Sequence, residues 1–249
     1  YLTLAQQLDR DLALETDLSL ATSQLPPLTA ELLQALVDQA EVASLDRPRY
    51  GWAIMAVADA AAAHISDRFL QACAAWYLAR AANDWLRPDR VEAAVQRARA
   101  LFADLNEPGW LAACDWQLYA VPWTRNFNTA TTQLTHALEG LIEADLSAFV
   151  PHCRLPLAYA AALIGNHALA EEQLIASEQT FAAQHDHLNV ARCLITRARN
   201  LRPQAQFEQA IEVIQTVQNG TGGVTELVRG KETFVRVYGR IAASSAGLT

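Results

Sequence analysis

The chain has 249 residues, of which 52% are hydrophobic and 18% are charged, so its composition excludes a disordered polypeptide and predicts a folded core. Its formal net charge of −8 argues against a general phosphate-binding surface, and we expect no nucleic-acid partner. No uncharged apolar run is long enough to cross a membrane, and the N-terminal residues lack the basic flank and apolar block of a signal peptide. The sequence does not begin with methionine, since its single methionine is Met55. We therefore expect a piece of a larger protein that is cytoplasmic and makes no membrane contact.

Helix-forming residues dominate the chain. Ala, Leu and Gln are abundant, there are only 10 Gly and 9 Pro, and strand-type runs are nearly absent, so the predicted fold class is all-α. In chain order, helices are expected over 1–22, 28–45, 49–64, 67–85, 88–105, 109–121, 127–145, 151–164, 167–184, 188–201, 204–218 and, after a glycine-containing break, 225–243. The predicted domains are an N-terminal helix over 1–27 that is part or cap of the array, a repeat array over 28–218, and a linker with a C-terminal helix over 219–249.

The cysteines reveal a period. They stand at positions 73, 114, 153 and 193, so the successive gaps are 41, 39 and 40 residues. Three further columns recur at about this spacing in the second helix of each predicted pair: Gly51, Val91, Ala130, Ala170 and Ala210; Met55, Val95, Leu134, Leu174 and Ile214; and Ala58, Ala98, Ala137, Ser177 and Val217. Their offsets lie along one helix face, and their small–large–small order lets a neighbouring helix approach closely. One cysteine per repeat indicates a buried structural position, since metal and disulfide frameworks need grouped cysteines.

Glycine, asparagine and proline mark the expected helix ends. Gly165 is predicted to take the left-handed conformation that ends one helix, and Asn166 to cap the next. Three prolines fall where helices should begin, a position that tolerates them: Pro48, Pro88 and Pro151. Pro122 and Pro156 fall inside expected helices, and each is predicted to mark an end or a kink.

The Leu157-Ala158 pair, the Gly165 turn and the small–large–small second helix resemble the tetratricopeptide repeat (TPR), in its variety of about 40 residues. The resemblance covers roughly 28–218, although Gln117-Leu118 stands where Leu-Ala is expected. It implies a right-handed superhelical solenoid of about five antiparallel helix hairpins, and a role in binding proteins or peptides. The Ala-rich, Arg-for-Lys composition also resembles bacterial TPR regions that precede caspase-like CHAT peptidase domains, or those of bacterial signalling regulators.

In the resembled family, the first helix of each hairpin lines a concave wall. The matching positions here are Trp76, Arg80, Asn83, Asp115, Tyr119, His152, Tyr159, Arg192, Ile195 and Arg199. Because aromatic and Arg side chains are enriched in binding hot spots, and Arg can hold a carboxylate through two hydrogen bonds, we expect a protein or peptide partner with an acidic or C-terminal segment, or an adjacent domain of the same polypeptide. The alternative is that the tyrosines pack between hairpins and that Arg80 and Arg199 pair with acidic residues of adjacent helices.

Two groupings resemble reactive sites but are predicted not to act as such. His185-Asp186-His187 and Cys193 are metal-ligand types, but no further cluster completes a four-ligand site. Adjacent helical residues such as His152 and Cys153 point about 100° apart, which disfavours a thiol–imidazole pair. We therefore expect no catalytic residue, no metal and no cofactor.

The function expected from the repeat is that of a protein-binding scaffold, the regulatory or sensing arm of a larger bacterial multidomain protein. The alternative is the N-terminal arm of a CHAT-type cysteine peptidase or of a transcriptional regulator, with the catalytic or DNA-binding domain outside this chain.

Overall fold

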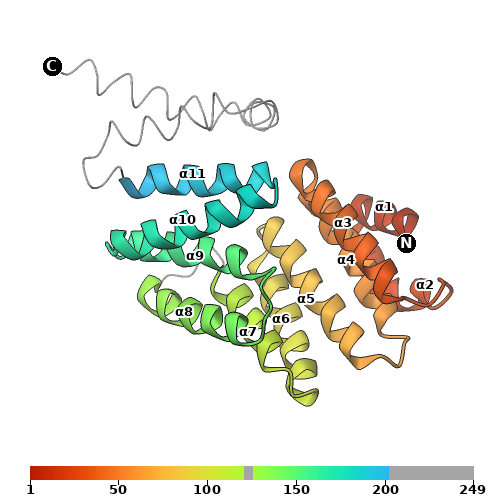
Figure 1. Cartoon of the computed structure of the whole chain (residues 1–249). Helices are drawn as coiled ribbons and strands as arrows, with labels where there is room; N and C mark the ends of the chain where they lie inside the picture. The colour runs from red at the N-terminus through yellow and green to blue at the C-terminus, as the bar shows by residue number, and fades with distance from the viewer. Residues whose placement is uncertain (121–125, 202–249) are drawn as a thin grey trace. The chain divides into compact units, whose positions relative to one another are not determined.

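The computed structural model describes residues 1–120 and 126–201, and every regular element in these ranges is a helix (Figure 1). The elements are α1 (Leu2–Arg10), η1 (Leu12–Asp17), α2 (Leu18–Thr22), α3 (Ala30–Asp46), α4 (Pro48–Ala62), α5 (Arg68–Asp84), α6 (Pro88–Asp104), α7 (Pro108–Tyr119), α8 (Phe127–Glu143), α9 (Val150–Leu163), α10 (His167–Ala183) and α11 (His187–Leu201). The predicted all-α class is confirmed. The helices expected over 204–218 and 225–243, the 219–249 part and Pro122 lie outside the described residues.

The helices group into two compact units, each of which has its own packing. In the N-terminal unit, which holds α1 to α7, consecutive helices pack in pairs, and the first helices α3, α5 and α7 also contact one another in order. In the C-terminal unit, which holds α8 up to Ile142 and α9 to α11, α10 packs between α9 and α11, and α9 also contacts α11. Contact of each hairpin with the next is the arrangement of a helical repeat.

The start of the chain differs from the prediction of one helix over 1–22. Asp11 is extended, with φ −135° and ψ 104°, and it separates α1 from the short 3₁₀ helix η1. Its side chain accepts a hydrogen bond from the backbone N–H of Ala13 at 3.0 Å. The break arises because a short acidic side chain can hydrogen-bond to nearby backbone and so competes with a continuing helix. Helices α1 and α2 both pack against α4 (Figure 1).

The turns between helices share one backbone design. A residue in the left-handed region, with φ between 55° and 81°, stands in five of them: Leu86, Asn106, Asp145, Gly165 and His185. Each is followed by a backbone N–H that donates back to the end of the preceding helix, for example Asn166 to the carbonyl of Ala161 at 2.9 Å. This is the Schellman pattern, which satisfies carbonyls that the helix leaves open. In the hairpin of α5 and α6, two helices of 17 residues with short turns account for the period of about 40 residues.

The predicted caps form as expected, with one exception. Asn166 accepts a hydrogen bond from the N–H of Leu169 at 3.2 Å, and Pro48, Pro88 and Pro151 lie in first turns. Helix α9, however, continues through Pro156 to Leu163, so this proline does not end the helix. The tertiary packing of the surrounding helix turns outweighs the local preference of one residue.

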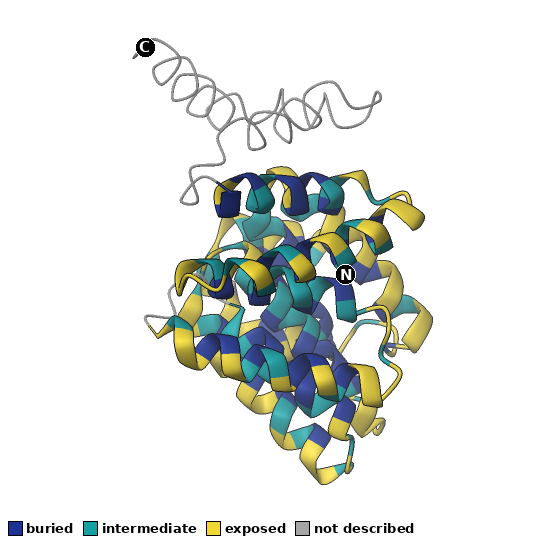
Figure 2. Cartoon of the chain, turned by 60° about the vertical axis from the view of Figure 1, so that its left-hand side comes forward, coloured by how far each residue is buried: buried dark blue, intermediate teal, exposed yellow. Residues whose placement is uncertain are grey.

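The small–large–small columns lie in the core. The described members of all three columns are buried, including Met55, Val95, Leu134 and Leu174, and Figure 2 shows buried residues recurring along the helices. Burying each large member stabilises the fold by about 2 kcal/mol. A side chain at Gly51 would place its Cβ 2.8 Å from the carbonyl oxygen of Ala40, so this glycine permits the close approach of α3 and α4. The period therefore reports helix packing, as predicted.

The four cysteines occupy one buried position in the first helices α5, α7, α9 and α11. They are Cys73, Cys114, Cys153 and Cys193, and all have free thiols. Burial raises the pKa of each thiol to about 12. They are therefore protonated at neutral pH and act as small apolar side chains. Separately, no helix in the described part of the chain is both long and apolar enough to cross a bilayer.

Candidate functional site

In the N-terminal unit, the predicted aromatic contact Trp76 belongs to the core. Its side chain is fully buried, with its ring 5.7 Å from Trp110 and 5.6 Å from Trp116 between ring centroids. A side chain without exposed surface cannot meet a partner in this conformation, so Trp76 is a packing residue here. Asn83 and Tyr119 keep partial exposure near the ends of α5 and α7.

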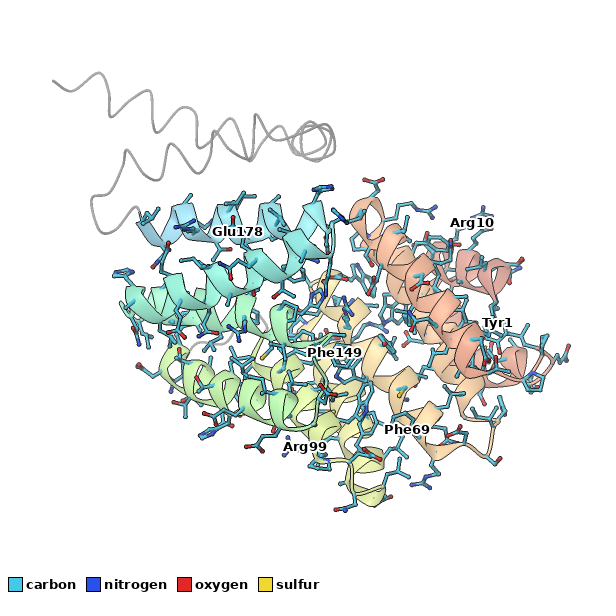
Figure 3. The ribbon with its side chains drawn as sticks, viewed as in Figure 1. Tyr1, Arg10, Phe69, Arg99, Phe149 and Glu178 are labelled. Carbon is cyan, nitrogen blue, oxygen red and sulfur yellow. The ribbon has the colours of Figure 1, made fainter. Side chains whose placement is uncertain are left out.

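The charged residues predicted in this unit are paired within it. Arg80 Nη2 lies 2.9 Å from Glu41 Oε1 of α3, and Asp115 pairs with Arg99 of α6 (Arg99 is labelled in Figure 3). Burial also raises the pKa of Tyr77, with a smaller raising contribution from Glu41 and an opposing one from Arg80. The alternative considered for Arg80, an ion pair with an adjacent helix, is what the structure shows.

In the C-terminal unit, helix α9 presents two of the predicted side chains. The half-buried ring of His152 meets Phe181 edge-on, with 4.9 Å between centroids. Tyr159 is 36% exposed, and its ring meets the ring of Phe127 edge-on, with 6.5 Å between the ring centroids. Helix α9 contains no acidic residue. Its exposed residues are Tyr159 and Leu163, and the helix carries no negative charge.

In the described part of this unit, helix α11 carries exposed cations. Arg192 and Arg199 are exposed and Ile195 is half-buried between them. We call these three residues the α11 stripe. Arg192 Nη1 donates to Asn189 Oδ1 at 3.1 Å, an uncharged neighbour. The seven-residue interval places the two arginines on one helix face about 10 Å apart along the axis.

Two acidic residues of α10, Glu171 and Glu178, are directed to a different arginine of α11. Arg197 lies 2.5 Å from Glu171 and 3.8 Å from Glu178 between nitrogen and oxygen atoms (Glu178 is labelled in Figure 3). Burial raises the pKa of Glu178, and the nearby Arg197 opposes that shift. Helix α11 itself contains no acidic residue. The α11 stripe is therefore a surface of positive charge beside an apolar side chain.

The two groupings with reactive residue types have local structural roles. Asp186 accepts hydrogen bonds from the backbone N–H and the side-chain amide of Asn189, at 3.1 and 2.6 Å, and so caps the start of α11. Cys153 directs its thiol to the carbonyl oxygen of Leu134 at 3.7 Å, while His152 packs on Phe181. Neighbours in sequence thus face different partners.

The sequence did not indicate a groove between α4 and α6 in the N-terminal unit. It has a volume of about 410 Å³. Its apolar lining consists of Leu18, Trp52, Ala56, Ala60, Ala63, Leu78, Ala93 and Ala94, and its charged lining of Glu15, Asp59, Arg90 and Arg97. The one hint in the sequence was the seven-residue interval between Arg90 and Arg97, which places both arginines on one face of a predicted helix. We call this feature the α4–α6 groove.

Two ion pairs flank the groove. Arg90 forms two hydrogen bonds with Glu15 of η1, at 2.6 and 2.9 Å, and Arg97 Nη2 lies 2.5 Å from Asp59 Oδ2. Burial raises the pKa of Asp59 although Arg97 opposes the shift. The guanidinium carbon of Arg90 also lies 4.4 Å from the centroid of the Trp52 ring. The groove combines a preorganised cation with an alanine-rich surface.

Comparisons with known proteins support the fold. Neither a protein-family model nor a curated protein matches the sequence. Among solved structures, the chain is similar to aspartyl phosphate phosphatase F from Bacillus subtilis, at 10% identity and a TM-score of 0.54, over 98% of this chain and 68% of that one. It is also similar to a putative kinesin light chain from Podospora anserina with nearly identical TPR-like repeats, at 14% identity and a TM-score of 0.48, over 81% of this chain and 96% of that one. At 10% identity the first likeness shows the fold alone, a helical-repeat architecture that agrees with the packed hairpins.

Proposed function

We propose that this chain is a protein-binding scaffold without catalytic activity of its own, and that the α11 stripe in the C-terminal unit binds an acidic or C-terminal segment of a partner. In the larger protein, which we infer to be bacterial and cytoplasmic, the scaffold would be a regulatory or sensing arm. The observation that carries the proposal is the exposure of Arg192 and Arg199 on a helix with no acidic residue.

The chemistry of the stripe favours a carboxylate ligand. An Arg guanidinium can donate two parallel hydrogen bonds to one carboxylate, which adds geometric specificity to the charge attraction. Ile195 between the arginines provides an apolar contact, and Tyr159 on the contacting helix α9 provides exposed aromatic area. An acidic segment with an apolar residue would therefore meet matching groups at successive positions.

A selection experiment tests this function. A library of random peptides with free C-termini is selected on the purified chain, and on a variant carrying Arg192→Glu and Arg199→Glu. A matched control carries Arg10→Glu and Arg68→Glu, which changes the net charge equally at exposed positions of the other unit (Arg10 is labelled in Figure 3). We expect acid-rich peptides to be enriched by the wild type and the control, and at least tenfold weaker binding to the stripe variant. Equal binding to all three proteins, or enrichment of basic peptides, would refute the proposal.

A further inference from the structure

The α4–α6 groove contains a cation that is held in place independently of its acidic partner. Arg90 lies 4.4 Å from the ring centroid of Trp52 and 5.4 Å from that of Trp85, and the two rings are 5.0 Å apart. A guanidinium at such distances from aromatic faces gains cation–π stabilisation. While Arg90 makes these contacts, its Nη1 and Nη2 groups donate to a carboxylate, that of Glu15. Arg90 is therefore preorganised to receive one.

The carboxylate that occupies Arg90 comes from the short segment before α3. Glu15 belongs to η1, a 3₁₀ helix, and its side chain is 41% exposed. The side chains of Arg90 and Glu15 are 21% and 41% exposed, so a second carboxylate can reach this pair and replace Glu15 by accepting the same two hydrogen bonds. The pair at the other end differs, because the side chain of Asp59 is only 12% exposed and belongs to the packed helix α4. The carboxylate at the Arg90 end of the groove is therefore the one that a partner can replace.

The chain's own segment shows which ligand pattern fits this end. Glu15 contacts Arg90, and three residues later Leu18 lines the groove and is 5% exposed. A glutamate followed at this interval by an apolar residue presents both on one face of a helical turn. The alanines of α4 and α6 leave the rest of the groove, about 410 Å³, unfilled by this segment. A longer segment with the same pattern could bury further apolar surface there.

We propose that the α4–α6 groove is a second docking site, for an acidic partner segment in which a glutamate is followed three residues later by leucine or another apolar residue. Residues 12–19 of this chain compete with that segment for Arg90. The site lies on second helices of the N-terminal unit and does not depend on the α11 stripe.

A labelled synthetic peptide tests the site directly. The probe is a short sequence of Ala, Gln and Ser that carries one Glu and, three residues later, one Leu; a second probe has Gln in place of that Glu. All proteins carry Arg192→Glu and Arg199→Glu, so that binding at the α11 stripe does not contribute. Binding is measured by fluorescence anisotropy, and by tryptophan emission, since Trp52 and Trp85 flank Arg90.

Removing the competitor and removing the receptor should have opposite effects. We expect Glu15→Gln to tighten binding of the Glu probe about fivefold or more, and Glu15→Gln with Arg90→Gln to abolish the gain. Arg68→Gln, which removes an exposed pair with Asp104, is the control and should change nothing. If the Arg90 variant does not fold, the comparison of the Glu and Gln probes on the Glu15→Gln protein remains decisive. Equal affinity for both probes, or equal affinity of the wild type and the Glu15→Gln protein, would overturn the proposal.

Discussion

The two units have the same hairpin design but differ in how far certain arginines of their first helices are exposed. In the N-terminal unit, arginines of α5 and α6 pair with carboxylates of other helices, as in Arg80 with Glu41 and Arg97 with Asp59. In the C-terminal unit, Arg192 and Arg199 remain exposed on α11, and the contacting helix α9 holds no acidic residue. In the function proposed above, arginines of first helices thus stabilise one unit and bind a partner in the other.

The largest effect on the free energy of unfolding is expected at alkaline pH, and it should occur in both units. Burial raises the pKa of each of the four thiols from an ordinary value of 9.0 to about 12. Because each thiol ionises more readily in the unfolded chain than in the fold, the free energy of unfolding is unaffected by the thiols below pH 9. It falls as pH rises towards 12, by up to about 1.4 kcal/mol per pH unit for each thiol.

Urea unfolding at several pH values between 8 and about 11 measures this loss, with a Cys153→Ala variant as the control for other groups that titrate there. The variant should lose stability less steeply with pH than the wild type. The same slope for both proteins would show that the thiol at 153 ionises freely in the fold.

The next effect is a difference in stability between variants of two aromatic residues, Trp76 and Tyr159, which were both predicted to lie on the concave face. Trp76→Ala should reduce the free energy of unfolding by about 3–5 kcal/mol, because the fully buried ring contacts other rings. Tyr159→Ala in the C-terminal unit should cost less than about 1 kcal/mol, because its ring is partly exposed. Chemical denaturation of both variants gives the comparison, and similar losses would contradict the assignment of Trp76 to the core and Tyr159 to the surface.

Two glycines provide a smaller contrast, between packing and backbone conformation. Gly51→Ala should cost about 1–3 kcal/mol, because its Cβ would meet the backbone of α3. Gly165→Ala should cost about 1 kcal/mol, because φ is 81° although nothing lies within 4 Å of the added Cβ. Thermal unfolding distinguishes them further, because Ser44→Ala removes the side chain nearest to the added Cβ and should partly relieve the Gly51 variant but not the Gly165 variant. A Gly165→Ala protein as stable as the wild type would exclude the left-handed turn.

The period, helix ends and core columns could be predicted because they depend on local residue types. Gly165 and Asn166 identify their turn, whereas Leu86 adopts the same left-handed conformation without any signal in its chemistry. The burial of Trp76 could not be predicted, because it depends on side chains of α7. The pairing of Arg80 was one of two alternatives, and the sequence could not identify Glu41 of α3 as its partner. The α4–α6 groove was missed for the same reason, since Glu15 and Arg90 are far apart in the sequence.

The smallest effect concerns the turn at Leu86, and it should stabilise the N-terminal unit. Leu86 has φ 57° and is 62% exposed, so its conformation is unfavourable and little packing is lost on replacement. Leu86→Gly should raise the free energy of unfolding by about 1 kcal/mol, whereas Leu86→Ala, which keeps a Cβ, should not. Melting temperatures of the two variants measured side by side check this, and a less stable Gly variant would argue against the turn.

The most direct test of the proposed division between the units compares Arg80 with Arg192. Titration calorimetry with the best acidic peptide from the selection is performed on the wild type, on Arg80→Glu and on Arg192→Glu. Because Arg80 is already engaged by Glu41 and Arg192 is exposed, the account predicts unchanged affinity for Arg80→Glu and about tenfold weaker binding for Arg192→Glu. Loss of binding in the Arg80 variant with full binding in the Arg192 variant would contradict it.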